Sequence, residues 1–371
     1  MTPALHEAWF AERQLDGRVR CTLCPHDCRI TDGSRGACAV RFNEHGVLYT
    51  LVFDRVVASN LEPIEKKPFF HVKPGSLAYS IATVGCNQQC AFCQNWEIAQ
   101  WPREELPRRL GGDHGEAPVP LAALAYIIPG RTLSPEAIVN AAIAAGASSI
   151  AYTFTEPTIF FELAYETAVQ ARARGLKNLF VTNGYISEPA LRKITTVLDA
   201  ANIDLKFFRE ESYRRISRAG LRPILDAIWL YHALGVWVEV TTLVIPGVND
   251  SDQELQQIAE FIRSVGPEVP WHVSQFCPAY KMVDRPETPV ETLRRAREVG
   301  ISAGLQYVYE GNVPGESGEH TICPACRTVL IGRYGFAVRE NRIKDGGCCP
   351  ACGTHIDGVD MDGVSVRRSV R

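Results

Sequence analysis

The chain has 371 residues and a net charge of −3, with 46% hydrophobic and 22% charged residues. This length and hydrophobic content suit one large domain with appendages, or two to three smaller domains, and argue against extensive disorder. The near-neutral charge gives no reason to expect nucleic acid or an anionic membrane as a partner. The sequence has no apolar run of the roughly 18–20 residues that cross a bilayer, and its start lacks the apolar segment of a signal peptide. We therefore expect a cytoplasmic protein without a membrane partner.

The cysteines are numerous and clustered. The chain contains 13, and all but Cys277 fall into three groups. Because the cytosol keeps thiols reduced, clustered cysteines there indicate metal binding rather than disulfides. The groups are Cys21, Cys24, Cys28 and Cys38; Cys86, Cys90 and Cys93; and Cys323, Cys326, Cys348, Cys349 and Cys352.

The first group lies in "CTLCPHDCRITDGSRGAC", with two, three and nine residues between its cysteines. Four thiolates on short loops can close a tetrahedron around zinc, which is the preferred interpretation. A second iron–sulfur cluster would use the same four ligands, so this alternative stays open. We expect residues 1–50 to form an N-terminal metal-binding segment.

The middle of the chain alternates strand-like and helix-like segments. Helix starts are marked by Ser134-Pro135, by Ser187, and by Ser251 with Glu254 as a capping box. Such alternation predicts a parallel α/β sheet of right-handed βαβ units, and the number of units favours a complete or partial barrel over residues 51–315. The apolar strand-like runs are 77–84, 148–154, 177–183, 201–207, 236–244, 271–276 and 306–310.

One long connection interrupts this rhythm. Residues 101–133 are rich in proline and glycine and delay the first crossover helix. A lid, a partner-docking insertion and a tolerated loop are all compatible with this pattern.

The C-terminal part, residues 316–371, contains two Cys-Pro-Ala-Cys sequences about twenty residues apart, typical of a zinc ribbon or a rubredoxin-like site. Zinc would be structural there, whereas iron would serve electron transfer. Ribbons also bind nucleic acid, but the basic residues of this one read as a solvated surface, so nucleic acid is not expected. The ligands by register are Cys323, Cys326, Cys349 and Cys352, with Cys348 as the spare.

The second group, in "GCNQQCAFCQNW", has three cysteines and no fourth in the same loop. The loop directly follows the first strand, at the end of the barrel where active sites lie. An iron–sulfur cube is normally held by four thiolates, so Cys86, Cys90 and Cys93 alone would leave one iron open for a small molecule. A zinc site with a distant fourth ligand and buried structural thiols are the alternatives.

"CNQQCAFC", with Phe92 before its last cysteine, matches the CxxxCxxC signature of radical S-adenosylmethionine (SAM) enzymes. "VTNGY", "IDLKFF" and "VIPGVND" resemble the third-, fourth- and fifth-strand motifs of the branch that includes the pyruvate formate-lyase activating enzyme. The ordered motifs cover residues 70–312, and the whole chain resembles the radical enzyme of the AmmeMemoRadiSam group. The resemblance implies a partial (βα)6 TIM-like radical SAM barrel flanked by small cysteine-rich metal-binding modules.

The resemblance also implies residue roles. Cys86, Cys90 and Cys93 would hold a [4Fe–4S] cluster whose open iron chelates SAM. Where the family usually has a Gly-Gly-Glu-Pro turn, this chain has Thr155-Glu156-Pro157, which retains the glutamate for the SAM amine but lacks both glycines. Simpler alternatives are a helix cap for the glutamate, an ion pair between the fourth-strand residues and a plain turn in the third-strand motif. The implied SAM contacts are Glu156, Asn183, Asp204 and Lys206.

The implied reaction is reductive cleavage of SAM to methionine and a 5′-deoxyadenosyl radical, which abstracts hydrogen from an unidentified substrate. An activase-like enzyme would act on a protein substrate and receive its electron from a donor such as flavodoxin or ferredoxin. From a different class, a zinc-ribbon-type binding protein with a non-catalytic central metal site is the alternative.

Overall fold

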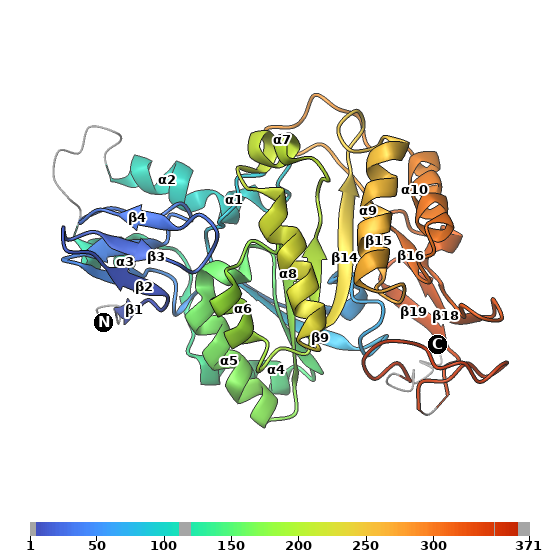
Figure 1. Ribbon diagram of the computed structural model, residues 1–371. Helices are drawn as coiled ribbons and strands as arrows, with labels where there is room; N and C mark the ends of the chain where they lie inside the picture. The colour runs from blue at the N-terminus through green and yellow to red at the C-terminus, as the bar shows by residue number, and fades with distance from the viewer. Residues whose placement is uncertain (1–4, 111–119, 345, 363–371) are drawn as a thin grey trace.

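The computed structural model describes residues 5–110, 120–344 and 346–362, and an eight-stranded sheet forms its centre (Figure 1). The strand order is β16-β15-β14-β13-β12-β11-β9-β8. All neighbours pair in parallel except β8, which runs antiparallel to β9. The bounds are β8 (Ala58–Pro63), β9 (Leu77–Ala82), β11 (Ser149–Tyr152), β12 (Lys177–Thr182), β13 (Ala200–Asp204), β14 (Trp237–Val244), β15 (Trp271–Gln275) and β16 (Val308–Gly311). Each parallel strand overlaps an apolar run predicted for it, whereas β8 was not predicted.

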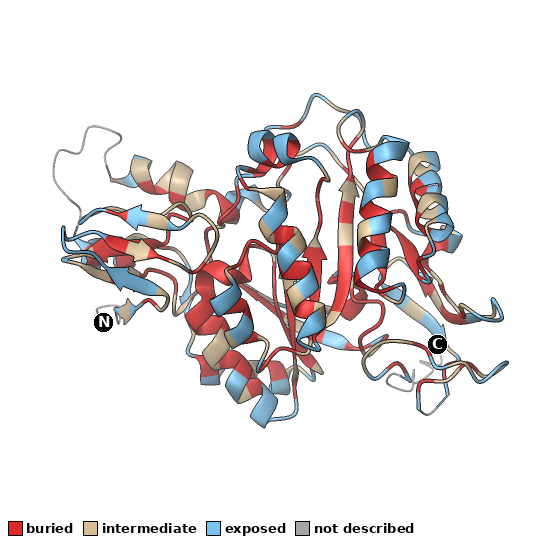
Figure 2. Cartoon of the chain, in the orientation of Figure 1, coloured by how far each residue is buried: buried red, intermediate tan, exposed pale blue. Residues whose placement is uncertain are grey.

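Helices cross between successive parallel strands and stand along the outer side of the sheet (Figure 1). They turn a buried side toward the sheet and an exposed side outward (Figure 2). Because the sheet keeps two edges, at β8 and β16, the barrel is open. The predicted partial (βα)6 barrel is therefore confirmed. The crossover helices are α4 (Pro135–Ala144), α5 (Phe161–Ala173), α6 (Glu188–Ile194), α8 (Leu221–Ala233), α9 (Asp252–Val265) and α10 (Val290–Ser302).

The predicted helix caps are partly confirmed, since Ser187 stands at a helix start but its hydroxyl accepts no capping hydrogen bond. The Ser134 hydroxyl accepts from the backbone N–H of Ala137, and the Ser251 hydroxyl accepts from that of Glu254. The second half of the predicted capping box is wrong, because the Glu254 carboxylate does not return to Ser251. It instead accepts from the backbone N–H of Phe208 at 2.8 Å, beyond the end of β13. A tertiary contact thus replaces the local one.

The N-terminal part folds into two three-stranded sheets, ordered β1-β6-β5 and β2-β3-β4. It is tied to the barrel through buried Arg41, whose guanidinium lies 2.6 Å from the Glu162 carboxylate on α5. The strands are β1 (His6–Glu7), β2 (Ala11–Arg13), β3 (Val19–Cys21), β4 (Cys28–Ile30), β5 (Arg41–Glu44) and β6 (Val47–Thr50).

The long connection is largely helical where it is described, and residues 111–119 lie outside the described part. It contacts the N-terminal sheets, since the backbone N–H of Leu121 donates to Glu44 at 3.1 Å and Arg35 donates to the Pro102 carbonyl at 2.8 Å. Its short strand β10 pairs with β7. The connection contains α2 (Trp101–Arg109), α3 (Leu121–Ile127) and β10 (Arg131–Thr132). Outside it, β7 (Arg55–Val56) precedes β8, and α1 (Trp96–Ala99) follows the cysteine loop.

The C-terminal part forms the antiparallel sheet β17 (Thr321–Ile322), β18 (Val329–Tyr334) and β19 (Ala337–Asn341). It packs against the segment that precedes β9. Arg333 donates to the carbonyl of Phe70 at 2.9 Å, and Lys73 donates from its backbone to the carbonyl of Val359 at 2.8 Å. Within the described ranges, no helix is long and apolar enough to cross a membrane.

Candidate active site

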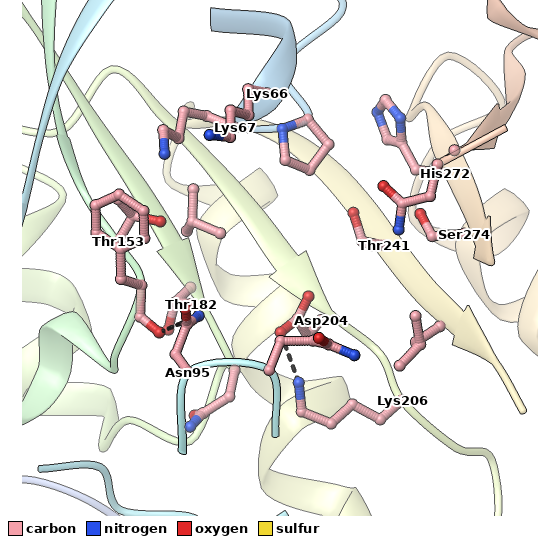
Figure 3. A pocket seen from close by; sticks show the side chains of 18 of the residues that line it. Lys66, Lys67, Asn95, Thr153, Thr182, Asp204, Lys206, Thr241, His272 and Ser274 are labelled. Carbon is pink, nitrogen blue, oxygen red and sulfur yellow. Dashed lines mark hydrogen bonds and ion pairs between the residues drawn. The ribbon is translucent and has the colours of Figure 1, made fainter. Parts of the chain in front are cut away.

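A cavity of about 560 Å³ lies at the carboxyl ends of the parallel strands (Figure 3). Parallel strands bring their carboxyl ends to one edge of a sheet, so loops distant in sequence meet there. The cysteine triplet and all four residues expected to contact SAM are in the wall. The predicted residues that line the cavity are Cys86, Cys90, Cys93, Glu156, Asn183, Asp204 and Lys206.

The cysteine loop follows β9, and backbone hydrogen bonds to a turn after β13 hold its middle part. Gly85 opens the loop at φ +100°, a conformation that favours glycine. Gln89 and Ala91 then donate backbone hydrogen bonds to the carbonyls of Ser217 and Ile216, at 2.9 and 3.0 Å. These acceptors belong to a π-helical turn, Tyr213–Ser217, a geometry found often at functional sites. The loop is therefore anchored on both flanks.

The Cys86 and Cys90 thiols have polar partners from outside their own turn. The Cys86 sulfur accepts from the backbone N–H of Gln88 at 3.3 Å and lies 3.7 Å from the side-chain amide of Asn183, while the Cys90 sulfur lies 3.3 Å from the Ser217 hydroxyl. Burial raises the pKa of all three thiols, to about 12 for Cys93. A bound metal deprotonates such thiols. Three thiols on one anchored loop, with N–H donors toward sulfur, fit an iron–sulfur cube with one iron left open.

Glu156 is buried and ties two strand ends together. Its Oε1 accepts from the backbone N–H and hydroxyl of Thr158, at 3.0 and 2.6 Å, and from the Thr182 hydroxyl at 2.7 Å. Its Oε2 accepts from the backbone N–H of Asn183 at 2.8 Å. The helix-cap alternative is thus realised, at the start of the 3₁₀ turn Pro157–Phe160. Since a carboxylate has about four acceptor positions and Oε2 uses one, that oxygen can still accept from an ammonium group in the cavity.

Asn183 connects the third strand to the cysteine loop. Its amide nitrogen donates to the side-chain oxygen of Asn87 at 2.9 Å, and its own oxygen accepts from the backbone N–H of Tyr185 at 2.9 Å. Both ends of the amide are therefore held, and its nitrogen faces the Cys86 sulfur. This geometry places Asn183 against the triplet.

Asp204 and Lys206 form an ion pair in the cavity wall, with 2.5 Å between Oδ2 and Nζ (Figure 3). Burial works to lower the pKa of Lys206, but the charge of Asp204 outweighs it, so the pKa lies above its ordinary value. The ammonium therefore stays charged. The ion-pair alternative is realised, and both side chains nevertheless line the cavity.

Several wall residues were missed by sequence reasoning. Lys66 and Lys67 lie in a segment to which the sequence assigned no role, and Phe336, at the β18–β19 turn, belongs to the C-terminal part. His272 lines the cavity from β15, and its Nε2 lies 2.7 Å from the buried Glu239 carboxylate on β14. His272 and Ser274 share one face of β15 (Figure 3), so period-two alternation was the one available signal.

The C-terminal cysteines form two matching knuckles whose four sulfurs lie within 4.8 Å of one another. Two sulfur pairs, Cys323 with Cys352 and Cys326 with Cys349, are each 3.6 Å apart. A hydrogen bond with the Thr328 hydroxyl lowers the pKa of the Cys326 thiol to about 6, which favours the thiolate that binds metal. These four thiols fit one tetrahedral ion.

The N-terminal cysteines also come together. The pairing of β3 with β4 sets Cys21 opposite Cys28. The backbone N–H of Ala37 donates to the Cys28 sulfur at 3.3 Å. This contact places Cys38, the next residue after Ala37, close to Cys28. Burial raises the pKa of Cys24, and the thiols of the other three cysteines raise it further, so all four are neighbours.

Residues 80–262 match the family model described as the Radical SAM superfamily. The chain belongs to this superfamily and is an enzyme of the radical SAM class, which uses a [4Fe–4S] cluster and SAM. It is 42% identical over 357 residues to "Uncharacterized protein MJ0808" of Methanocaldococcus jannaschii, covering 96% of this chain and all of that protein.

Solved structures also match parts of the chain. A domain of pyruvate-formate lyase-activating enzyme from Bacteroides vulgatus is 17% identical, with a TM-score of 0.39, over 45% of this chain and 100% of that one. A radical SAM methyltransferase from Sphaerobacter thermophilus is 15% identical, with a TM-score of 0.44, over 65% of this chain and 70% of that one.

Proposed function

We propose that this protein cleaves SAM reductively at a [4Fe–4S] cluster held by Cys86, Cys90 and Cys93, and that the resulting 5′-deoxyadenosyl radical abstracts hydrogen from a substrate. One observation carries the proposal. The three thiols share a single cavity with side chains from the ends of β11, β12 and β13 that suit the polar groups of SAM. The binding-protein alternative is not favoured, because it gives no reason for this convergence.

The chain's own residues orient the cofactor. Glu156 accepts the methionine ammonium on Oε2, and the Lys206 ammonium pairs with the methionine carboxylate. Asp204 accepts from the ribose hydroxyls, and Asn183 fixes the cysteine loop next to them. When bound, the cluster supplies the electron that breaks the sulfonium–C5′ bond.

The substrate is a protein in this proposal, and the cellular setting is the cytoplasm. The support is the ordered resemblance to glycyl-radical-enzyme activases and to the AmmeMemoRadiSam radical enzyme, which spans the barrel. A one-electron donor such as flavodoxin or ferredoxin supplies the electron that reduces the cluster.

The decisive experiment is SAM cleavage by anaerobically reconstituted protein with dithionite. We expect 5′-deoxyadenosine and methionine, and we expect Cys86→Ala, Cys90→Ala and Cys93→Ala each to abolish both products. Cys277→Ala is the matched control, because this cysteine lies outside the three groups, and it should keep the activity. Absence of product at full cluster occupancy contradicts the proposal.

The substrate class is tested with extracts of cells grown on deuterated amino acids. Dialysis separates the macromolecular fraction from small molecules, and each fraction is incubated with the reduced enzyme and SAM. Mass spectrometry should find deuterium in 5′-deoxyadenosine with the macromolecular fraction. Deuterium with the dialysate alone would exclude a protein substrate.

A further inference from the structure

The N-terminal cysteines lie partly inside the hydrophobic core. Two of them, Cys21 and Cys38, are buried, with 6% and 8% of their surfaces exposed, and they belong to the same hydrophobic core as Cys90 of the triplet. Gly36 packs closely beside the Cys28 thiol, because a methyl group there would lie 3.0 Å from the Ile30 side chain and 3.6 Å from the Cys28 sulfur. Four converging thiols that are shielded in this way point to a ligand.

The spacing of the thiols distinguishes this site from the C-terminal one. In residues 5–110, 120–344 and 346–362, the C-terminal set is the one place where three or more metal-ligating atoms all lie within 4.8 Å of one another. Neither the N-terminal set nor the Cys86 triplet is that compact. A cluster of several irons binds each thiolate at a different metal and holds the sulfurs farther apart than a single ion does. Among the described residues, the N-terminal set and the triplet both fall outside the 4.8 Å limit that the C-terminal site meets, as expected for ligands of a larger cluster.

The N-terminal site also touches the triplet's loop directly. Arg103 donates to the carbonyl of Ala37, next to Cys38, and to the carbonyl of Cys86, the latter at 2.6 Å. His26, between Cys24 and Cys28, lies with its Nε2 2.6 Å from the carbonyl of Asn87.

The absence of a side chain at Gly85 lets the loop of the triplet pack closely against the segment Cys38–Val40. A methyl group there would lie 2.8 Å from the Val40 side chain and 3.2 Å from the carbonyl of Cys38. This close approach suits a redox centre, because it places the N-terminal thiols beside the loop of the other proposed cluster.

We propose that Cys21, Cys24, Cys28 and Cys38 hold a second iron–sulfur cluster beside the catalytic loop. That the neighbouring loop is catalytic rests on the proposed function, but the presence of this cluster does not. The backbone N–H of Ala37, which donates to the Cys28 sulfur, is the kind of hydrogen bond that tunes such a cluster.

The test uses the full chain carrying Cys86→Ala, Cys90→Ala and Cys93→Ala together, purified anaerobically and supplied with ferrous iron and sulfide. After desalting we expect about four acid-labile sulfides and at least about four irons per chain, because a four-cysteine cluster remains. Sulfide is the decisive quantity, since a single ion at the C-terminal site brings none. Bound zinc at the N-terminal site with no sulfide would overturn the proposal.

Two controls guard the measurement. A chain lacking both the triplet and the N-terminal cysteines should retain no sulfide, and retention there would mean adventitious iron sulfide only and would also overturn the proposal. In the triplet variant, the electron paramagnetic resonance signal of the reduced cluster should not change when SAM is added, because every iron is already ligated. A SAM-sensitive signal in that variant contradicts a four-thiolate cluster. Failure of SAM cleavage by the wild type would leave these readouts unaffected.

Discussion

The backbone N–H of Asn183 donates to Glu156 Oε2 at 2.8 Å, and this bond joins the turn after β11 to the end of β12. The Asn183 side chain then reaches the sulfur of Cys86 at 3.7 Å. One chain of contacts therefore runs from a buried carboxylate to a thiol of the triplet. A substitution at Glu156 should therefore weaken the binding of SAM and alter the position of the cysteine loop.

Replacing Glu156 with alanine removes four accepted hydrogen bonds and the partner proposed for the SAM ammonium. Because hydrogen bonds to charged groups contribute about 1.5–3 kcal/mol each, SAM affinity should fall at least about tenfold. Equilibrium binding of SAM to the reconstituted variant measures this. Thr158→Val removes one donor to the same carboxylate, so its effect should be much smaller. Equal losses in the two variants would assign Glu156 a structural role alone.

The Ser217 hydroxyl, 3.3 Å from the Cys90 sulfur, should tune the cluster. Ser217→Ala removes a donor to the thiolate, which leaves more negative charge on sulfur and should lower the reduction potential. A redox titration followed by electron paramagnetic resonance measures the shift. Ser187→Ala is the control, because the Ser187 hydroxyl is buried without a hydrogen-bond partner. An unchanged potential in Ser217→Ala would contradict the prediction.

Glu239 should make stability depend on pH. Burial alone would raise its pKa, but the hydrogen bond and charge of His272 and the backbone N–H of His71 lower it below its ordinary value of 4.5. A lowered folded-state pKa stabilises the fold above the unfolded-state pKa, and the contribution is lost as pH falls through the folded-state pKa. Glu239→Gln should therefore cost about 1.5–3 kcal/mol at neutral pH. Urea unfolding at neutral and acidic pH measures this, and the difference from wild type should shrink below pH 4.5. A difference that is constant with pH would refute the assignment.

Metal removal should affect the C-terminal site selectively. Cys326→Ser should release the ion held by the four-thiol set and lower Tm, because metal binding stabilises a small module. Cys348→Ser should keep both the ion and Tm, since Cys348 lies outside that set. Elemental analysis and thermal unfolding measure both quantities. Loss of metal from Cys348→Ser would mean that the ligands are exchanged.

The parallel strands were predictable because both sheet faces are covered, so their sequences read as apolar runs. All four residues of β11 are buried, for example. Strand β8 escaped prediction because Ala58–Pro63 is half-buried or exposed throughout and lies at the sheet edge. Glu254 was mispredicted for a related reason. A local capping box competes with a tertiary partner, Phe208, and sequence spacing cannot weigh the two.

Within the site, the sequence alone predicted the cysteine triplet and the two flanking thiol sets as metal ligands, because their spacing is short, but it left zinc and iron open for the flanking sets. It also placed Glu156, Asn183, Asp204 and Lys206 at strand ends, because a parallel sheet turns strand order into position. Only the tertiary structure decided that Glu156 already binds four protein donors, and that Phe336 and His272 complete the cavity.

The tertiary structure alone also decided that the N-terminal thiols lie against the loop of Cys86. Such relations depend on distances between residues far apart in the chain. Packing sets those distances, and no local pattern records them.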